Sequence, residues 1–207
     1  MGHAALHHAA GNRRVALARA AGLAALVVLA GCDRTGQKVP FQSIDISGAE
    51  WGRDFRLQGT DGQPVQLADF RGRCVLLFFG FTQCPDFCPT ALYGITQALE
   101  KLGPKADKLV PIFITVDPER DTPAQLKNYA QNFDKRIVML TGSAGEIAAV
   151  ARAYRVYYAK RPLEKPGEYT MDHSAYIYLL DAGGKYLTHF RHAVPPDELA
   201  KALERRL

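Results

Sequence analysis

The sequence predicts an α/β fold in which helices cover a central sheet. Two apolar runs, Val75–Phe79 and Leu109–Val116, do not alternate with polar residues, which is typical of strands buried on both faces. Helical segments follow them, and two of these open with capping-box patterns at Thr122–Gln125 and Ser143–Glu146. No glycine-rich phosphate loop follows any of the strands. The order of elements therefore fits a thioredoxin-like layout, with a central mixed sheet, better than a doubly wound nucleotide-binding fold.

The remaining elements follow from local patterns. Asp54–Leu57 and Pro64–Leu67 alternate in polarity around Thr60–Gly62, which predicts an N-terminal β-hairpin extension with an Asp-Gly turn. Apolar residues recur at helical spacing from Thr90 to Leu102. The other expected elements are helices from Thr122 to about Phe133, from Ser143 to about Tyr154 and from Pro195 onward, strands at Ile137–Leu140, Ala175–Leu180 and Tyr186–Phe190, and a projecting hairpin within Tyr157–Met171.

Two cysteines, Cys84 and Cys88, stand between the first buried strand and the helix after it. The carboxyl end of such a strand is where α/β sheets bind ligands, and the backbone N–H groups of a helix N-terminus favour thiolate over thiol. If the first helical turn holds both cysteines, they share a face with Cβ atoms roughly 5–6 Å apart. Such a pair could close a disulfide or bind one soft metal ion. The prolines, Asp86 and Thr90 around the thiols argue against a purely structural pair, so the residues leave redox chemistry and metal binding both open.

Composition excludes several classes of function. The 207 residues, 47% of them hydrophobic and 23% charged, are typical of one globular domain with a short additional segment. The formal charge is +5, but residues 1–31 contain three arginines and no acidic residue. The rest of the chain carries 23 basic and 21 acidic groups. This balance, without a basic stripe interleaved with aromatic residues, argues against a nucleic-acid partner.

The first 31 residues have the features of an export signal. Arg13 and Arg14 precede the apolar run Ala20–Ala30, and Leu29–Cys32 reads Leu-Ala-Gly-Cys, which looks like a bacterial lipoprotein box with Cys32 as the lipidated residue. An apolar run this short does not span a bilayer; an uncleaved signal anchor is the alternative. The location expected for the chain is the periplasmic face of the bacterial inner membrane. The predicted parts are a signal peptide at 1–31, a lipid-anchored linker at 32–48 and a thioredoxin-like domain at 49–207.

The other cysteine and the histidines divide by position. Cys74 opens the buried strand and is expected to act as a small hydrophobic residue. His189 and His192 are interpreted as strand-edge or surface residues. His173 lies directly before a predicted strand, where Asp172 could orient its imidazole. From the residues alone a structural histidine is favoured at this position, and a ligand remains the alternative.

Three separate segments resemble the Sco/SenC family. They are FFGFTQCPDFCP at Phe78–Pro89, VDPERDTP at Val116–Pro123 and DHSAYIYLLD at Asp172–Asp181, and the resemblance extends from about Trp51 to the C-terminus. That family consists of membrane-tethered, thioredoxin-like copper proteins involved in assembling cytochrome c oxidase. The resemblance implies a copper ion, as Cu(I) or Cu(II), held by Cys84, Cys88 and His173. As partners it implies the copper-site subunit of cytochrome c oxidase and other periplasmic copper chaperones.

Two functions are consistent with this reading. The first is a metallochaperone rather than an enzyme, because two thiolates and one imidazole form a low-coordinate site suited to Cu(I), whereas a structural zinc site normally has four protein ligands. The alternative is a thiol–disulfide oxidoreductase that reduces the cysteines of the oxidase copper site through Cys84 and Cys88. Three residues separate these cysteines where thioredoxin-type enzymes have two, which weighs against the enzyme. The sequence does not distinguish which thiol would attack.

Overall fold

The computed structural model describes residues 52 and 54–207. The predicted signal peptide at 1–31, the lipidation site Cys32 and the linker at 32–48 lie outside the described residues, so these remain predictions. The strands are β1 Arg56–Gly59, β2 Pro64–Gln66, β3 Cys74–Gly80, β4 Leu109–Thr115, β5 Val138–Thr141, β6 Tyr158–Pro162, β7 Tyr169–His173, β8 Tyr176–Leu180 and β9 Tyr186–Arg191. The α-helices are α2 Phe87–Leu102, α3 Pro123–Ala130, α4 Ala144–Ala153 and α5 Pro196–Glu204.

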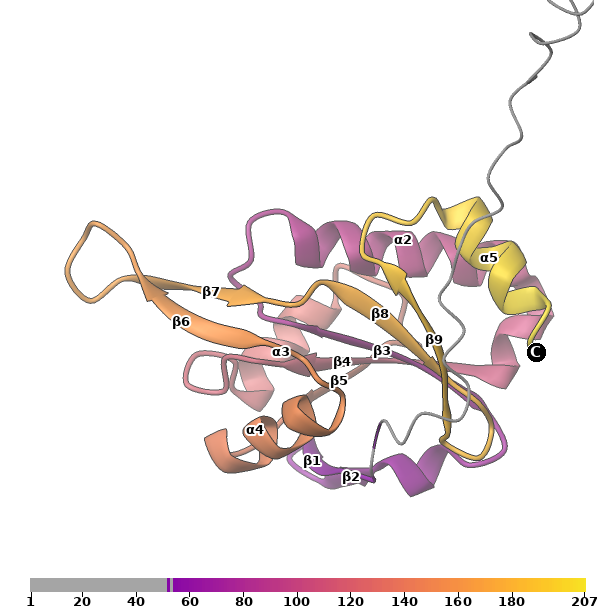
Figure 1. The fold of residues 1–207 in the computed structure, drawn as a ribbon, viewed down its shortest axis with the longest axis horizontal. Coiled ribbons are helices and arrows are strands. Elements are labelled where there is room, and N and C mark those ends of the chain that lie inside the picture. Colours follow the sequence, from indigo (N-terminus) through magenta and orange to yellow (C-terminus); the bar gives the residue numbers. More distant parts are fainter. Residues whose placement is uncertain (1–51, 53) are drawn as a thin grey trace, which may run out of the picture. The chain divides into compact units, whose positions relative to one another are not determined.

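A seven-stranded mixed sheet forms the centre of the domain (Figure 1). Its strand order is β2-β1-β5-β4-β3-β8-β9; β3, β4 and β5 run parallel, whereas β1 and β8 are antiparallel to β5 and β3. The predicted N-terminal hairpin is confirmed, and through β1 it is hydrogen-bonded to the edge of this sheet rather than standing apart from it. The thioredoxin-like α/β fold expected from the sequence is confirmed.

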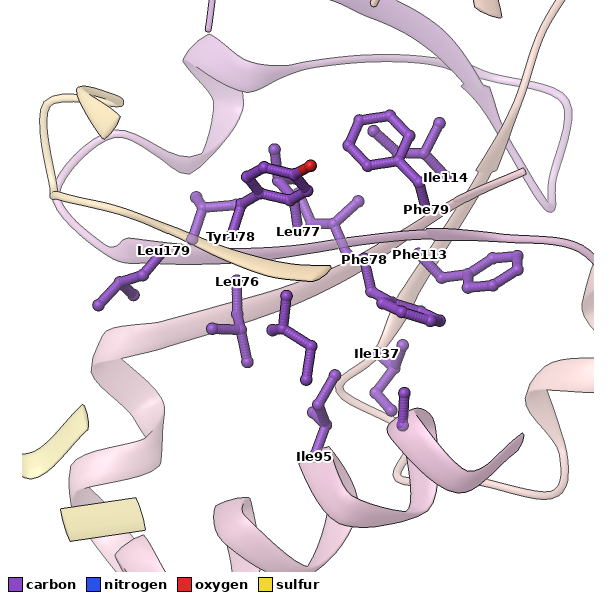
Figure 2. Packing of buried hydrophobic residues seen from close by; sticks show 14 of the residues in the cluster. Leu76, Leu77, Phe78, Phe79, Ile95, Phe113, Ile114, Ile137, Tyr178 and Leu179 are labelled. Atoms are coloured by element: carbon purple, nitrogen blue, oxygen red, sulfur yellow. The ribbon is translucent and has the colours of Figure 1, made fainter. Parts of the chain in front are cut away.

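The two central parallel strands are buried along their whole length, as their apolar sequences predict. Their side chains alternate between the two faces of the sheet: Phe78 and Phe113 lie on the side of Ile95 from α2, whereas Phe79 and Ile114 lie on the opposite side (Figure 2). Phe78 and Phe113 are adjacent, with ring centroids 6.2 Å apart. Two hydrophobic layers, one on each face of the sheet, therefore enclose β3 and β4.

Helices cover both faces of the sheet. The helices α2 and α5 lie together (Figure 1), and Lys101 pairs with Asp197 between them at 2.8 Å. Helix α4 begins with the predicted capping box, because Ser143 and Glu146 accept each other's backbone N–H groups. At α3, Thr122 accepts a hydrogen bond from the Gln125 N–H, but only this half of the predicted capping box forms.

Two element boundaries differ from the sequence-based expectation. Helix α2 begins at Phe87 rather than at Thr90, because Pro89 falls within the first turn, where a missing N–H costs no helical hydrogen bond. Helix α3 ends at Ala130 rather than near Phe133, and the chain continues through single turns, in which the Phe133 N–H donates to the Ala130 carbonyl.

Strands β6 and β7 pair with each other as a separate two-stranded sheet. This pair, called the His hairpin below because His173 ends β7, projects beyond the central sheet (Figure 1). It corresponds to the projecting hairpin predicted from the sequence. Among the described residues, no helix combines the length and the apolar character needed to cross a membrane.

Candidate metal centre

The candidate site lies where β3 ends and α2 begins. The connecting segment Phe81–Asp86, called the Cys loop below, carries Cys84, and Cys88 follows in the first turn of α2. Cys84 is therefore not part of the first helical turn, contrary to the arrangement considered from the sequence. Its Sγ instead accepts the Cys88 N–H at 3.4 Å. The Cys84 sulfur thus occupies the role of a helix N-cap, which the side chain of Asp86 at the N-cap position leaves unfilled.

Glycine at the end of β3 allows the Cys88 thiol to lie against the sheet. A Cβ atom on Gly80 would come within 2.7 Å of Cys88 Sγ and 2.8 Å of the Phe113 ring. Both distances are shorter than any normal van der Waals contact, so a larger residue would displace the thiol or the ring. The sequence analysis did not single out Gly80, although a glycine ending an otherwise apolar strand is the pattern expected at a close approach.

The structure brings Cys84, Cys88 and His173 together. Their ligand atoms all lie within 4.8 Å of one another, and Cys88 Sγ lies 3.6 Å from His173 Nε2. The three residues come from a loop, a helix and the His hairpin. The three candidate ligands named from the sequence thus form one cluster.

The imidazole of His173 is held in one tautomer. Its Nδ1 lies 3.0 Å from the carbonyl oxygen of Ser174, and because a carbonyl can only accept, Nδ1 carries the proton. The lone pair of Nε2 then faces the two sulfur atoms, which is the arrangement typical of a metal-ligating histidine. Phe81 meets the imidazole edge-on, with ring centroids 5.8 Å apart. The expectation that Asp172 orients this ring is wrong, because the Asp172 carboxylate instead faces Arg161 at 3.4 Å.

The two thiols differ strongly in acidity. The pKa of Cys84 is lowered to about 4, first because the Cys88 thiol hydrogen-bonds to it and further through backbone N–H groups at the start of α2. The pKa of Cys88 is raised, first by complete burial and then by the neighbouring Cys84. Cys84 therefore carries the thiolate and Cys88 keeps its proton. The helix start lowers the pKa of one cysteine only, whereas the sequence suggested the same effect for both.

A cavity of about 410 Å³ opens beside the cluster. Cys84 and His173 both line it, whereas Cys88 does not. The other lining residues come from the Cys loop, the start of α2 and the His hairpin: Phe81, Pro85, Asp86, Phe87, Arg161, Thr170, Met171 and Asp172. An approaching molecule therefore meets Cys84 and His173 first.

Asp121, in the loop after β4, holds the Cys loop in place through hydrogen bonds. This fully buried carboxylate accepts hydrogen bonds from the Thr82 N–H at 3.0 Å, the Thr82 hydroxyl at 2.6 Å and the Thr115 hydroxyl at 2.6 Å. Burial raises its pKa, and these hydrogen bonds oppose the rise. Sequence reasoning did not assign this role, although a carboxylate after a buried strand was the available signal.

The remaining cysteine and histidines lie apart from the cluster. Cys74 is buried at the opposite end of β3, where its thiol is 3.9 Å from the Arg206 carbonyl, and burial raises its pKa. His189 Nδ1 lies 2.6 Å from the Tyr186 hydroxyl oxygen, within hydrogen-bond distance, and desolvation lowers the pKa of His189. His192 packs on the ring of Phe87, with centroids 4.7 Å apart. These placements agree with the structural roles expected for all three.

A thioredoxin-like domain with two thiols and one imidazole at the carboxyl end of a buried strand defines a class of dithiol proteins equipped to bind a soft metal. Within that class, the chain belongs to the SCO1/SenC family, whose sequence profile matches residues 45–207. The family predicted from the three sequence segments is thereby confirmed.

Individual relatives agree with this placement. The chain is 43% identical over 156 residues to the mitochondrial SCO2 homolog of Bos taurus, a match that covers 74% of this chain and 59% of the bovine protein. It is 46% identical to Bradyrhizobium japonicum ScoI with copper bound, which it matches with a TM-score of 0.71 over 76% of this chain and 99% of that one. BsSco, described as a member of the Sco family of cytochrome c oxidase assembly proteins with a disulfide switch, is 28% identical, with a TM-score of 0.61 over 79% of this chain and 96% of that one.

Proposed function

We propose that this protein is a copper-binding assembly factor that holds copper through Cys84, Cys88 and His173. The observation that carries the proposal is the convergence of these three ligand atoms within 4.8 Å. The donor set fits copper, because thiolate sulfur selects soft ions such as Cu(I) and imidazole suits copper as well. The Cys84 thiolate and the free Nε2 lone pair of His173 are ready to bind, and Cys88 would lose its proton as the metal arrives.

In this proposal copper is the cargo, and the copper-site subunit of cytochrome c oxidase receives it. The cavity beside Cys84 and His173 supports transfer, since an incoming thiol could reach two of the three ligands from that side. Other periplasmic copper chaperones would supply the ion. The membrane anchor at Cys32 would keep the domain at the periplasmic face of the inner membrane, where this oxidase subunit is accessible.

A second candidate function, reduction of a disulfide in the copper site of the oxidase, is favoured by the unequal acidity of the two thiols. The Cys84 thiolate lines the cavity and could attack a partner disulfide, after which Cys88 would displace the partner thiol. Cys84 and Cys88 would end as a disulfide, and the partner would gain two electrons, one proton from Cys88 and a second proton from water. The chain would then act as a thiol–disulfide oxidoreductase, and the same pair could serve both functions in turn.

The deciding experiment is an anaerobic copper titration of the full chain, reduced beforehand. One copper per chain is expected, with affinity lowered at least tenfold by either Cys84→Ser or Cys88→Ser. Cys74→Ala is the matched control, because Cys74 lies at the other end of β3, and it should leave the stoichiometry unchanged. Absence of copper binding in the wild type, together with stoichiometric reduction of a disulfide in the copper-site subunit, would replace the first function by the second.

A further inference from the structure

The position of His173 depends on a hairpin that is not part of the central sheet. Strands β6 and β7 pair only with each other in the described part of the chain, and Figure 1 shows them projecting beyond the sheet. A two-stranded hairpin alone is marginally stable in water. The contacts that hold the hairpin to the rest of the domain therefore decide where the imidazole lies.

Polar contacts from the hairpin converge on the loop Asp117–Asp121 between β4 and α3, called the acidic loop below. The Tyr169 hydroxyl donates to Asp117 Oδ1 at 2.9 Å, and Arg120 Nη1 donates to the Tyr169 carbonyl at 2.9 Å. The guanidinium of Arg120 also stacks on the Tyr169 ring, 3.7 Å from its centroid. Arg120 and Tyr169 thus join the acidic loop to the beginning of β7, four residues before His173.

The same arginine also reaches the Cys loop. Arg120 Nη1 donates to Gln83 Oε1 at 2.9 Å, next to Cys84 in the sequence. Arg120 Nε is paired with Asp117, whose carboxylate is only 2% exposed. One guanidinium therefore contacts the acidic loop, the Cys loop and the His hairpin, which are the three segments around the cluster.

An arginine suits this task because its donors form a rigid planar fork that can serve several acceptors and stack on a ring at once. The nearby Lys160–Glu119 ion pair also links the hairpin to the acidic loop, at 2.7 Å. Both of its side chains are exposed to solvent, and exposed ion pairs of this kind contribute little to stability. The polar contacts of Arg120 with the hairpin and the acidic loop are partly buried, so we expect them to contribute more than the Lys160–Glu119 pair.

We propose that Arg120 is a positioning residue that sets the His hairpin against the Cys loop and thereby places His173 Nε2 beside Cys88 Sγ. This inference rests on the proposed copper site, because it concerns how that site acquires its third ligand. Without the Arg120 contacts, the cysteine pair would remain in place through Asp121, but the imidazole would be held less firmly. Copper would then be bound by two sulfur atoms for much of the time.

The first test needs no metal. Hydrogen exchange of the full-length, metal-free, reduced chain is compared between wild type, Arg120→Lys and the control Arg136→Lys. Arg136 is a suitable match because it also forms a two-pronged ion pair, with Asp134 at 2.9 and 2.6 Å, but does not contact the site segments. Arg120→Lys should accelerate exchange in β6 and β7 about tenfold while β3 and β4 stay protected, and Arg136→Lys should not. Unchanged hairpin exchange in Arg120→Lys would overturn the proposal.

The second test is a double-mutant cycle on Cu(II) affinity, with nitrogen hyperfine coupling as the spectroscopic readout. Arg120→Lys alone should weaken Cu(II) binding about tenfold and reduce the imidazole coupling. In a His173→Ala background the same change should have almost no further effect, because the ligand it positions is gone. Additive losses would show a general structural role instead and would overturn the proposal.

Tyr169→Leu provides an independent variant should Arg120→Lys fail to fold, because it removes the ring on which the Arg120 guanidinium stacks, 3.7 Å from the ring centroid. Tyr169→Phe, which keeps this ring and loses only the hydroxyl that donates to Asp117, is the control. Hairpin exchange that is faster in Tyr169→Leu than in Tyr169→Phe supports the proposal, and equal exchange in the two variants opposes it. If the wild type binds no copper, the proposed function fails, whereas the exchange comparison on the metal-free chain still decides whether Arg120 positions the hairpin.

Discussion

Cys88 Sγ lies 3.6 Å from His173 Nε2, although 85 positions separate the two residues in the sequence. This contact joins the first turn of α2 to the end of the His hairpin. The ring proton of His173 lies on Nδ1, which donates a hydrogen bond to the Ser174 carbonyl. The imidazole therefore presents a lone pair to the thiols before any metal is present.

Replacing Gly80 by alanine should destabilise the domain by about 1–3 kcal/mol, the usual cost of overpacking a core. The new methyl group would meet Cys88 Sγ and the Phe113 ring at 2.7 and 2.8 Å. Urea unfolding measures the loss. Gly94→Ala in α2 is the control: nothing lies within 4 Å of its added Cβ, so it should stabilise the domain by up to about 1 kcal/mol through helix propensity. Equal effects of the two substitutions would refute this account of Gly80.

Alkylation of Cys84 by iodoacetamide should remain fast at acidic pH. Its pKa is lowered from 9.0 to about 4, with the hydrogen bond from Cys88 as the largest cause. Mass spectrometry should show a rate at Cys84 that is nearly constant from pH 9 downward and declines only near pH 4. Cys88→Ala should raise the pKa of Cys84, whereas Cys88→Ser keeps a hydroxyl donor and should raise it less. A rate in the wild type that declines with a pKa near 9 would contradict this assignment.

The same shift makes stability depend on pH. The folded pKa of Cys84 lies below its unfolded value. Its contribution to the free energy of unfolding is therefore complete above the unfolded pKa of about 9. It decreases as the pH falls and is lost below the folded value of about 4. The reduced wild-type chain should therefore lose more stability between pH 9 and pH 4 than Cys84→Ser does. Parallel pH profiles from denaturant unfolding would show that the thiolate makes no such contribution.

Asp121→Asn should loosen the Cys loop and cost about 1–3 kcal/mol, the penalty for leaving buried polar groups unsatisfied. The native carboxylate accepts hydrogen bonds from Thr82 and Thr115. The NH₂ group of an asparagine would instead face some of these N–H and O–H groups, which cannot accept a hydrogen bond from it. Thermal unfolding checks the expected decrease. Asp107→Asn changes an exposed carboxylate and should be neutral; equal stability of both variants would remove Asp121 from this role.

Cys32→Ala should release the chain from the membrane fraction, because it removes the residue predicted to carry the lipid. Fractionation of cells expressing the full chain, with Cys74→Ala for comparison, measures the change. Retention of the Cys32 variant in the membrane would favour an uncleaved signal anchor.

The sequence predicted the scaffold well because β3 and β4 depend on apolar runs that only a doubly buried strand accommodates. It could not by itself assign His173, because the hairpin that carries this residue is placed by contacts with the acidic loop, far away in the sequence. The family resemblance supplied that candidate. The unequal acidity of Cys84 and Cys88 could not be predicted from the sequence either, because it depends on where α2 begins and on how deeply each sulfur is buried. Asp172 was assigned to the imidazole by proximity in sequence, whereas strand geometry turns its side chain toward Arg161.

The most direct measurement is X-ray absorption and nitrogen hyperfine spectroscopy on the full chain loaded with one equivalent of copper. The account predicts two sulfur neighbours at about 2.3 Å, typical of metal–thiolate bonds, and one imidazole that disappears in His173→Ala. His192→Ala, which removes the imidazole packed on Phe87, should leave both signals intact. An imidazole signal that survives in His173→Ala, or a single sulfur neighbour in the wild type, would contradict the three-ligand site.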